Sequence, residues 1–163
     1  MTLSLAGTLT VALVSLTTAQ TSTPAADWHL SADGVRARIA DIAAWQHQVL
    51  GSRPTGRSLA QWIRARAEYA HRQQPPSWLQ RDGWVVEGPQ GAFRLGVGRV
   101  ARMGNRSLAL NTAENRARAQ LSRLGGEGAA QAILRGVEII DWYQSANGEL
   151  YVLAAQAVLA AAR

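Results

Sequence analysis

The spacing of the apolar residues changes in the middle of this chain, at Pro75-Pro76. Before this break, apolar residues recur every three or four positions, which is the period of an amphipathic helix; after it, they follow the spacing of strands. This order favours an α+β fold, in which helices pack on one face of an antiparallel sheet. We expect a helical hairpin followed by a ββαββ unit with a four-stranded sheet.

The first expected helix has Ser31 or Asp33 as its N-cap and ends at Gly51 and Pro54. A second helix is expected from Ser58, where Ser58 and Gln61 fit a capping box. Two helices with a short connection form an antiparallel hairpin by default. The tryptophans of the two helices, Trp45 and Trp62, are expected to meet in its core.

The first pair of strands is expected at residues 84–87 and 92–100, joined by a turn at residues 88–91. Gly96 and Gly98 lie two positions apart, on the same face of the second strand. Glycine inside a strand indicates the close approach of another element. The expected partner is the alanine-rich helix that follows.

That helix is expected to be capped by Ser107 or Asn111 and to end at Gly125-Gly126. Its apolar face is read as Leu110, Ala113, Ala117, Leu121 and Leu124, with Glu114 and the arginines pointing largely outward. Residues 129–134 could add one further helical turn.

The last two strands are expected at Val137 to Tyr143 and Glu149 to Gln156. Asn147-Gly148 between them is a strong hairpin signal, because both residue types tolerate the positive φ of a type I′ turn. For residues 154–163, the pattern leaves open whether the strand continues or a terminal helix begins.

Aromatic side chains on this hairpin are candidates for contact with a partner protein. Trp142 and Tyr143 alternate, so one faces the helices and the other faces the open side of the sheet. An aromatic on an open face with arginines nearby suits a protein partner. The candidate partner-binding residues are Trp142, Tyr143, Tyr151, Arg116 and Arg118. The alternative, a set of half-buried sheet residues, is equally compatible with the pattern.

Arginine supplies the whole positive charge of the chain. The 17 basic residues include no lysine and give a net charge of +6. Arginine prefers planar partners such as carboxylates, phosphates and aromatic faces. The charge permits contact with nucleic acid, anionic lipid or acidic polymers, but a GC-rich coding sequence would also explain arginines that are spread along the chain.

Residues that would support catalysis or metal binding do not form a recognisable pattern. The chain has no cysteine, which excludes disulfides and thiolate metal sites. Its histidines (His29, His47 and His71) are isolated in the sequence. Glu138 and Asp141 lie at odd spacing on one expected strand and therefore on opposite faces, and no G-x-S-x-G motif is present. We expect no enzymatic activity, cofactor or metal.

The N-terminal segment has the pattern of an export signal. Residues 3–19 carry no charge and are followed by small and polar residues, which favours a signal peptide over residues 1–20 with a mature start near Gln20 to Ser22. Residues 21–75 then form a linker and the helical hairpin, and residues 76–163 form the α+β domain.

The C-terminal half resembles the LPP20 family of bacterial envelope lipoproteins. The motifs that carry the resemblance, in chain order, are Pro76-Ser77-Trp78, Phe93-Arg94-Leu95-Gly96-Val97-Gly98, Ala117-Arg118-Ala119-Gln120-Leu121 and the segment from Gly136 to Ala154. The resemblance implies export to the periplasm or outer membrane, no enzymatic activity, and a structural or assembly role. Related proteins include accessory components of the flagellar motor that assemble into rings.

We therefore expect a non-enzymatic exported envelope protein that contacts other envelope proteins or copies of itself. Membrane contact is compatible with this expectation, although the chain lacks a cysteine for lipid attachment. The competing interpretation is an arginine-rich module that binds nucleic acid, since arginines and aromatics on a sheet suit single-strand binding. Export disfavours this second interpretation.

Overall fold

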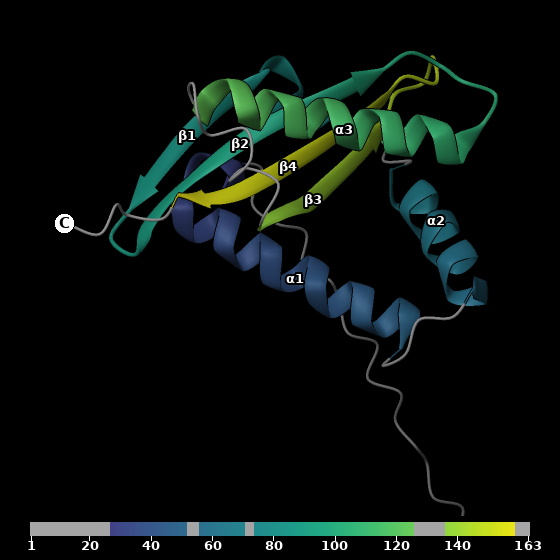
Figure 1. The fold of residues 1–163 in the computed structure, drawn as a ribbon, viewed down its shortest axis with the longest axis horizontal. Coiled ribbons are helices and arrows are strands. Elements are labelled where there is room, and N and C mark those ends of the chain that lie inside the picture. Colours follow the sequence, from purple (N-terminus) through teal and green to yellow (C-terminus); the bar gives the residue numbers. More distant parts are fainter. Residues whose placement is uncertain (1–26, 52–55, 71–73, 126–135, 159–163) are drawn as a thin grey trace, which may run out of the picture.

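The computed structural model describes residues 27–51, 56–70, 74–125 and 136–158, with the side chains of residues 56–59 left aside. Its elements are η1 (Trp28–Leu30), α1 (Ala32–Leu50), α2 (Gly56–Ala70), η2 (Ser77–Gln80), β1 (Gly83–Gly88), β2 (Gly91–Val100), α3 (Arg106–Gly125), β3 (Val137–Gln144) and β4 (Leu150–Val158). All strand neighbours are antiparallel, in the order β1-β2-β4-β3. The α+β fold with a ββαββ sheet after two helices is therefore confirmed (Figure 1). The expected signal peptide and the segments 129–134 and 159–163 lie outside the described residues.

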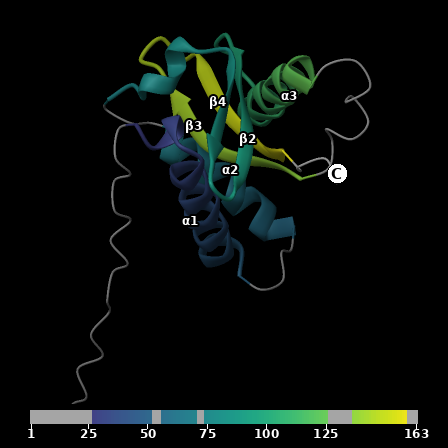
Figure 2. The same ribbon diagram turned by 90° about the vertical axis from the view of Figure 1, so that its left-hand side faces the viewer.

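Helices cover both faces of the sheet, so the expectation of an open face was wrong. On one face, α3 packs through Ala113 and Leu121 against β4 residues such as Val152. On the other face, α1 packs through Val35 against Leu153, together with further residues of the sheet and of η2. Figure 2 shows α1 and α3 on opposite sides of the strands. The helical hairpin was expected on the same face of the sheet as α3. The start of α1 instead packs on the opposite face.

Close contact between α3 and β2 depends on two glycines, as the sequence indicates. A Cβ atom on Gly98 would lie 1.8 Å from the carbonyl oxygen of Ala113, and one on Gly96 would lie 2.6 Å from that of Ala117. Both distances are far inside van der Waals contact, so no other residue fits without moving the helix. The two glycines therefore fix where α3 lies on the sheet.

The helix starts match the sequence in one case out of three. The hydroxyl of Ser31 accepts a hydrogen bond from the Gly34 N–H and caps α1, as expected. The cap of α3 is Asn105, whose side chain accepts from the Leu108 N–H, and not Ser107 or Asn111. Helix α2 begins at Gly56, so Ser58 lies inside it. Caps are easily misplaced by a few residues where several polar side chains precede a helix.

An irregularity in β3 changes which side chains share a face. Ile139 pairs with Ala154 and Asp141 pairs with Leu153, so Ile140 is an extra residue in the strand. Such a β-bulge shifts the alternation by one position. Glu138 pairs with Ala155, two positions from the partner of Asp141. The two carboxylates therefore lie on the same face of β3, and the expectation of opposite faces was wrong.

The hairpin between β3 and β4 is centred where the sequence indicates, but its turn differs. The Gly148 N–H donates to the carbonyl of Ser145, and Gly148 has a φ of 86°. No described residue other than glycine has a positive φ, so Asn147 does not adopt the conformation that a type I′ turn requires. Ser145 accepts hydrogen bonds within the wider loop and stabilises it.

Candidate functional site

Two of the predicted partner-binding aromatics are buried. Trp142 is 1% exposed and Tyr143 is 7% exposed. The Trp142 ring packs against Trp45, Trp62 and Tyr69, at centroid distances of 6.0, 5.9 and 5.9 Å. The predicted contact between Trp45 and Trp62 is confirmed, with ring centroids 5.0 Å apart. Trp142 and Tyr143 thus serve the core, because helices cover the face that was expected to be open.

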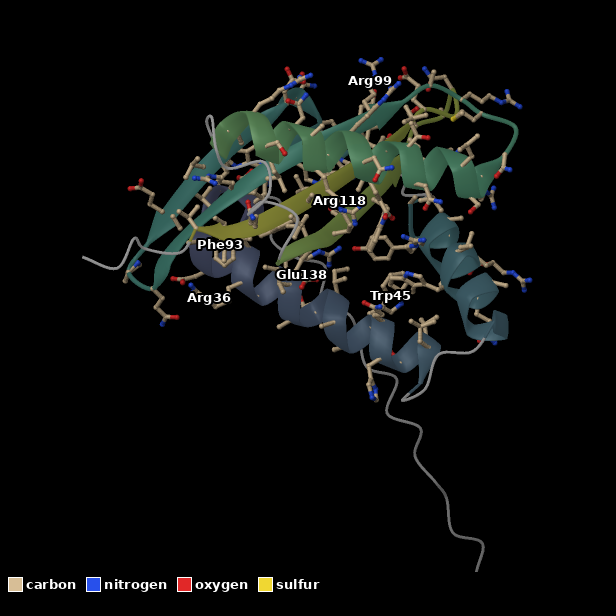
Figure 3. The ribbon with its side chains drawn as sticks, viewed as in Figure 1. Arg36, Trp45, Phe93, Arg99, Arg118 and Glu138 are labelled. Carbon is tan, nitrogen blue, oxygen red and sulfur yellow. The ribbon has the colours of Figure 1, made fainter. Side chains whose placement is uncertain are left out.

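The other predicted residues lie on two sides of α3. Arg116 and Tyr151 line one hollow, whereas Arg118 lines another. In Figure 3, Arg99, which shares the hollow of Arg116, lies above α3 and Arg118 lies below it. The structure therefore brings Arg116 and Tyr151 together and separates Arg118 from them.

We name the hollow beside Arg116 the arginine groove. Its volume is about 350 Å³. It is lined by residues of α3, β2, β4 and η2 and of the segment that leads from η2 into β1: Leu79, Arg81, Asp82, Val97, Arg99, Arg116, Ala119, Gln120, Arg123 and Tyr151. Four arginines and a single acidic residue therefore face this space.

The groove lies where β2 extends beyond its neighbour. Strand β1 begins at Gly83, opposite Gly96, while β2 continues to Val100. The Val97 N–H still donates to the carbonyl of Asp82, at 2.8 Å. Two residues further on, the carbonyl of Arg99 accepts a hydrogen bond of 2.6 Å from the Arg116 guanidinium. A side chain of α3 thus reaches the edge of β2 at the point where strand pairing on this side has stopped.

The arginines of the groove differ in how their charges are balanced. Arg99 forms an ion pair of 2.6 Å with Glu149, and its guanidinium lies over the ring of Tyr151 at 5.5 Å. Hydrogen bonds, chiefly from Arg99, hold the pKa of Glu149 below its usual value. Burial, and then its hydrogen bond to Glu149, raise the pKa of Tyr151. Tyr151 therefore stays a neutral hydroxyl at physiological pH and leaves the positive charge of the groove unreduced.

The remaining groove arginines have no carboxylate partner among the ion pairs of the described residues. Arg81 lies over the ring of Trp84, with its guanidinium carbon 5.3 Å from the centroid. Arg123 donates to the side-chain oxygen of Gln120 at 3.3 Å. Arg116 binds a backbone carbonyl. These contacts orient the guanidinium groups without neutralising them, so the groove presents an excess of positive charge.

The second hollow lies between α1, α2, α3 and β3, and its volume is about 230 Å³. Here Arg66 forms an ion pair with Glu114, and Arg118 approaches the same carboxylate at 3.8 Å. Glu114 is 8% exposed, so the expectation that it points outward was wrong. Burial lowers the pKa of Arg66, and its partner Glu114 opposes this shift. The charges of this hollow balance one another, in contrast to those of the arginine groove.

A buried network around Asp141 has a structural role. Asp141 is 0% exposed and accepts hydrogen bonds from Arg38 at 3.2 Å and from the Trp78 indole at 2.9 Å. Arg38 also donates to the carbonyl of Ile140 at 3.0 Å, at the bulge. These bonds join α1 and η2 to β3 and satisfy a carboxylate that would otherwise be costly to bury.

Across residues 27–51, 56–70, 74–125 and 136–158, no group of three histidine, cysteine, aspartate or glutamate residues could hold a metal ion. In the same part of the chain, no helix is both long and apolar enough to span a membrane. Comparison with protein-family models, with curated proteins and with solved structures found no match to this chain.

Sequence reasoning missed Arg81, Arg99 and Arg123 as members of the site. Part of the signal was present, because Arg116, Gln120 and Arg123 follow one another at steps of four and three on α3. This spacing places them on one side of a helix. Arg81 and Arg99 carry no comparable pattern, since their proximity depends on how η2 and β2 are placed in space.

Proposed function

We propose that this protein is a non-enzymatic, exported bacterial envelope protein that acts through contact with other proteins, as a structural or assembly accessory. The observation that carries the proposal is the arginine groove, a hollow lined by four arginines and a single acidic residue. Guanidinium groups suit the recognition of carboxylates on a partner. The resemblance of the C-terminal half to the LPP20 family supports the same role.

The chemistry of the groove favours an acidic segment of a partner protein. Guanidinium groups bind carboxylates through paired N–H donors. Several arginines around one space offer this geometry repeatedly, and a nearby tyrosine adds a contact that is common in protein interfaces. The groove thus supports binding to aspartate and glutamate side chains.

A pull-down from solubilised envelopes tests the proposal. The wild-type protein should recover a reproducible set of envelope proteins, and the variant with Arg81→Glu, Arg116→Glu and Arg123→Glu should lose them. Arg64→Glu is the matched control, because Arg64 is exposed on α2 and lies outside the groove. Equal recovery by all of these proteins would contradict the assignment of the groove.

Export is tested separately, by N-terminal sequencing of protein from the envelope fraction. We expect a mature start near Gln20 to Ser22. An intact Met1 on protein from the cytoplasmic fraction would overturn the proposed location.

A second candidate function, binding of single-stranded nucleic acid, is favoured by the same arginines beside Tyr151. Phosphate contacts make such binding strongly dependent on salt, because neutralised phosphates release their counterions. If recovered complexes contain RNA or DNA and disappear after nuclease treatment, this second function replaces the first.

A further inference from the structure

We infer that the arginine groove receives an extended acidic segment of the partner protein, which adds to the end of β2 as a short strand in line with β1. This inference rests on the proposed function and specifies how the groove binds. Strand addition to an exposed sheet edge is a general mode of peptide recognition, in which backbone hydrogen bonds supply affinity and side chains supply specificity.

The edge of β2 that faces the groove has room for such a strand. Pairing with β1 reaches Gly96, and residues 98–100 of β2 have no neighbouring strand on this side within the described residues. In an antiparallel ladder, every second residue directs both its N–H and its C=O to the same neighbour. The Val97 N–H is directed to Asp82, so the corresponding groups of Arg99 are directed into the space next to the start of β1, beyond Gly83.

The contact between Arg116 and Arg99 supports this reading. The carbonyl of Arg99 is the next ladder acceptor on this side, and it accepts from a guanidinium rather than from a backbone N–H. The side chain of Arg116 therefore occupies the place that the first N–H of an added strand would take. Because Arg116 is exposed, it can move aside and bind a carboxylate of the incoming segment.

The arginines that line the groove favour a negatively charged partner segment. Successive side chains of a strand point to opposite faces. On the α3 side, an added strand would meet Arg116 and Arg123, and on the η2 side it would meet Arg81, with Arg99 over Tyr151. Positive charge on both sides favours acidic side chains at consecutive positions. The volume of about 350 Å³ lies at the lower end of the range for ligand sites, roughly 300–1,000 Å³, and suits a short segment.

The test uses a fluorescein-labelled acetylated octapeptide of alternating glutamate and aspartate, and the same peptide with every backbone nitrogen methylated. Both have the same charge, but only the first can donate backbone hydrogen bonds. We expect the methylated peptide to bind at least about tenfold more weakly, since it loses the ladder bonds. Equal affinity of the two peptides, or no binding of the first at low salt, would overturn strand addition.

Amide hydrogen exchange supplies the second readout. Binding of the unmodified peptide should slow exchange of the Arg99 amide about tenfold or more, because it becomes part of a ladder. The Gly98 amide is the control, since it is directed to β4 and should not change. An unchanged Arg99 amide overturns the inference, and so does an octathymidylate that displaces the peptide at equimolar concentration. If Arg99 does not respond while the arginine variants still lose envelope proteins in the pull-down, the proposed function stands and only strand addition fails.

Discussion

The guanidinium of Arg116 donates a hydrogen bond of 2.6 Å to the carbonyl oxygen of Arg99. This bond links α3 to the edge of β2 at the point where β1 no longer pairs with it. Both residues line the arginine groove, so the bond joins its α3 side to its β2 side. Arg116 is nonetheless exposed, so its contribution to folding should be small and its main value should lie in binding.

Replacement of Arg116 and Arg123 by glutamine tests that distinction. Both side chains are exposed, and an exposed substitution usually changes the free energy of unfolding by no more than about 0.5 kcal/mol. We therefore expect a urea midpoint close to that of the wild type and a weaker affinity for acidic peptide. A loss of stability above about 2 kcal/mol, far outside that range, would show that these arginines maintain the fold instead.

Gly98→Ala should destabilise the protein strongly. The new methyl carbon would lie 1.8 Å from the carbonyl oxygen of Ala113, so α3 would have to move away from β2. Overpacking of this kind costs about 1–3 kcal/mol and sometimes more, and the short distance places this case at the upper end. Gly104→Ala is the control, because nothing lies within 4 Å of its added carbon. Equal thermal midpoints for the two variants would argue against the close packing of α3 on β2.

Asp141→Asn should also be costly, because it removes the negative charge from the buried ion pair with Arg38. Removing one member of a buried ion pair typically costs about 3–5 kcal/mol. Asp33→Asn removes an exposed carboxylate that pairs with Arg36 and should cost no more than about 1 kcal/mol. Denaturant unfolding of both variants measures the difference. If Asp141→Asn were as mild as Asp33→Asn, the network would not anchor β3.

The pKa of Glu149 is lowered in the folded protein, and this predicts how the stability changes with pH. Because the pKa is lower in the folded protein, the ionised carboxylate stabilises the fold at pH values above the pKa of the unfolded chain, 4.5. That contribution is lost as the pH falls below 4.5 and through the lower native value. A carbon-detected NMR titration of Glu149 should show the lowered value. In Arg99→Gln the titration should move upward, and a curve that does not move would exclude Arg99 as the cause.

The order of the elements was predictable because each has a local pattern. The helical spacing before Pro75 and the strand spacing after it follow directly from burial of one face. Gly96 and Gly98 also predicted the approach of α3 correctly, since glycine inside a strand often marks a site where another backbone comes close. Local patterns of this kind are reliable where the final packing agrees with them.

The features that were not predictable depend on residues far apart in the chain. The bulge at Ile140 receives a hydrogen bond from Arg38, about a hundred residues earlier in the sequence. The spacing of α3 predicts that Glu114 is a surface residue, but in the fold Glu114 is buried beside Arg66 of α2. Likewise, the arginine groove joins chain segments that are distant in the sequence, and only the stripe on α3 has a recognisable spacing. These features depend on tertiary packing between distant segments, so no local sequence pattern predicts them.

Photo-crosslinking tests the central claim, that the arginine groove binds a partner protein, most directly. A benzoylphenylalanine replaces Ala119, which is exposed in the groove, or Ala37, which is exposed on α1 outside it. After irradiation of intact cells, the Ala119 position should give a discrete protein adduct that resists nuclease, and the Ala37 position should not. An adduct that nuclease destroys, the same adduct from both positions, or none from either would contradict the account.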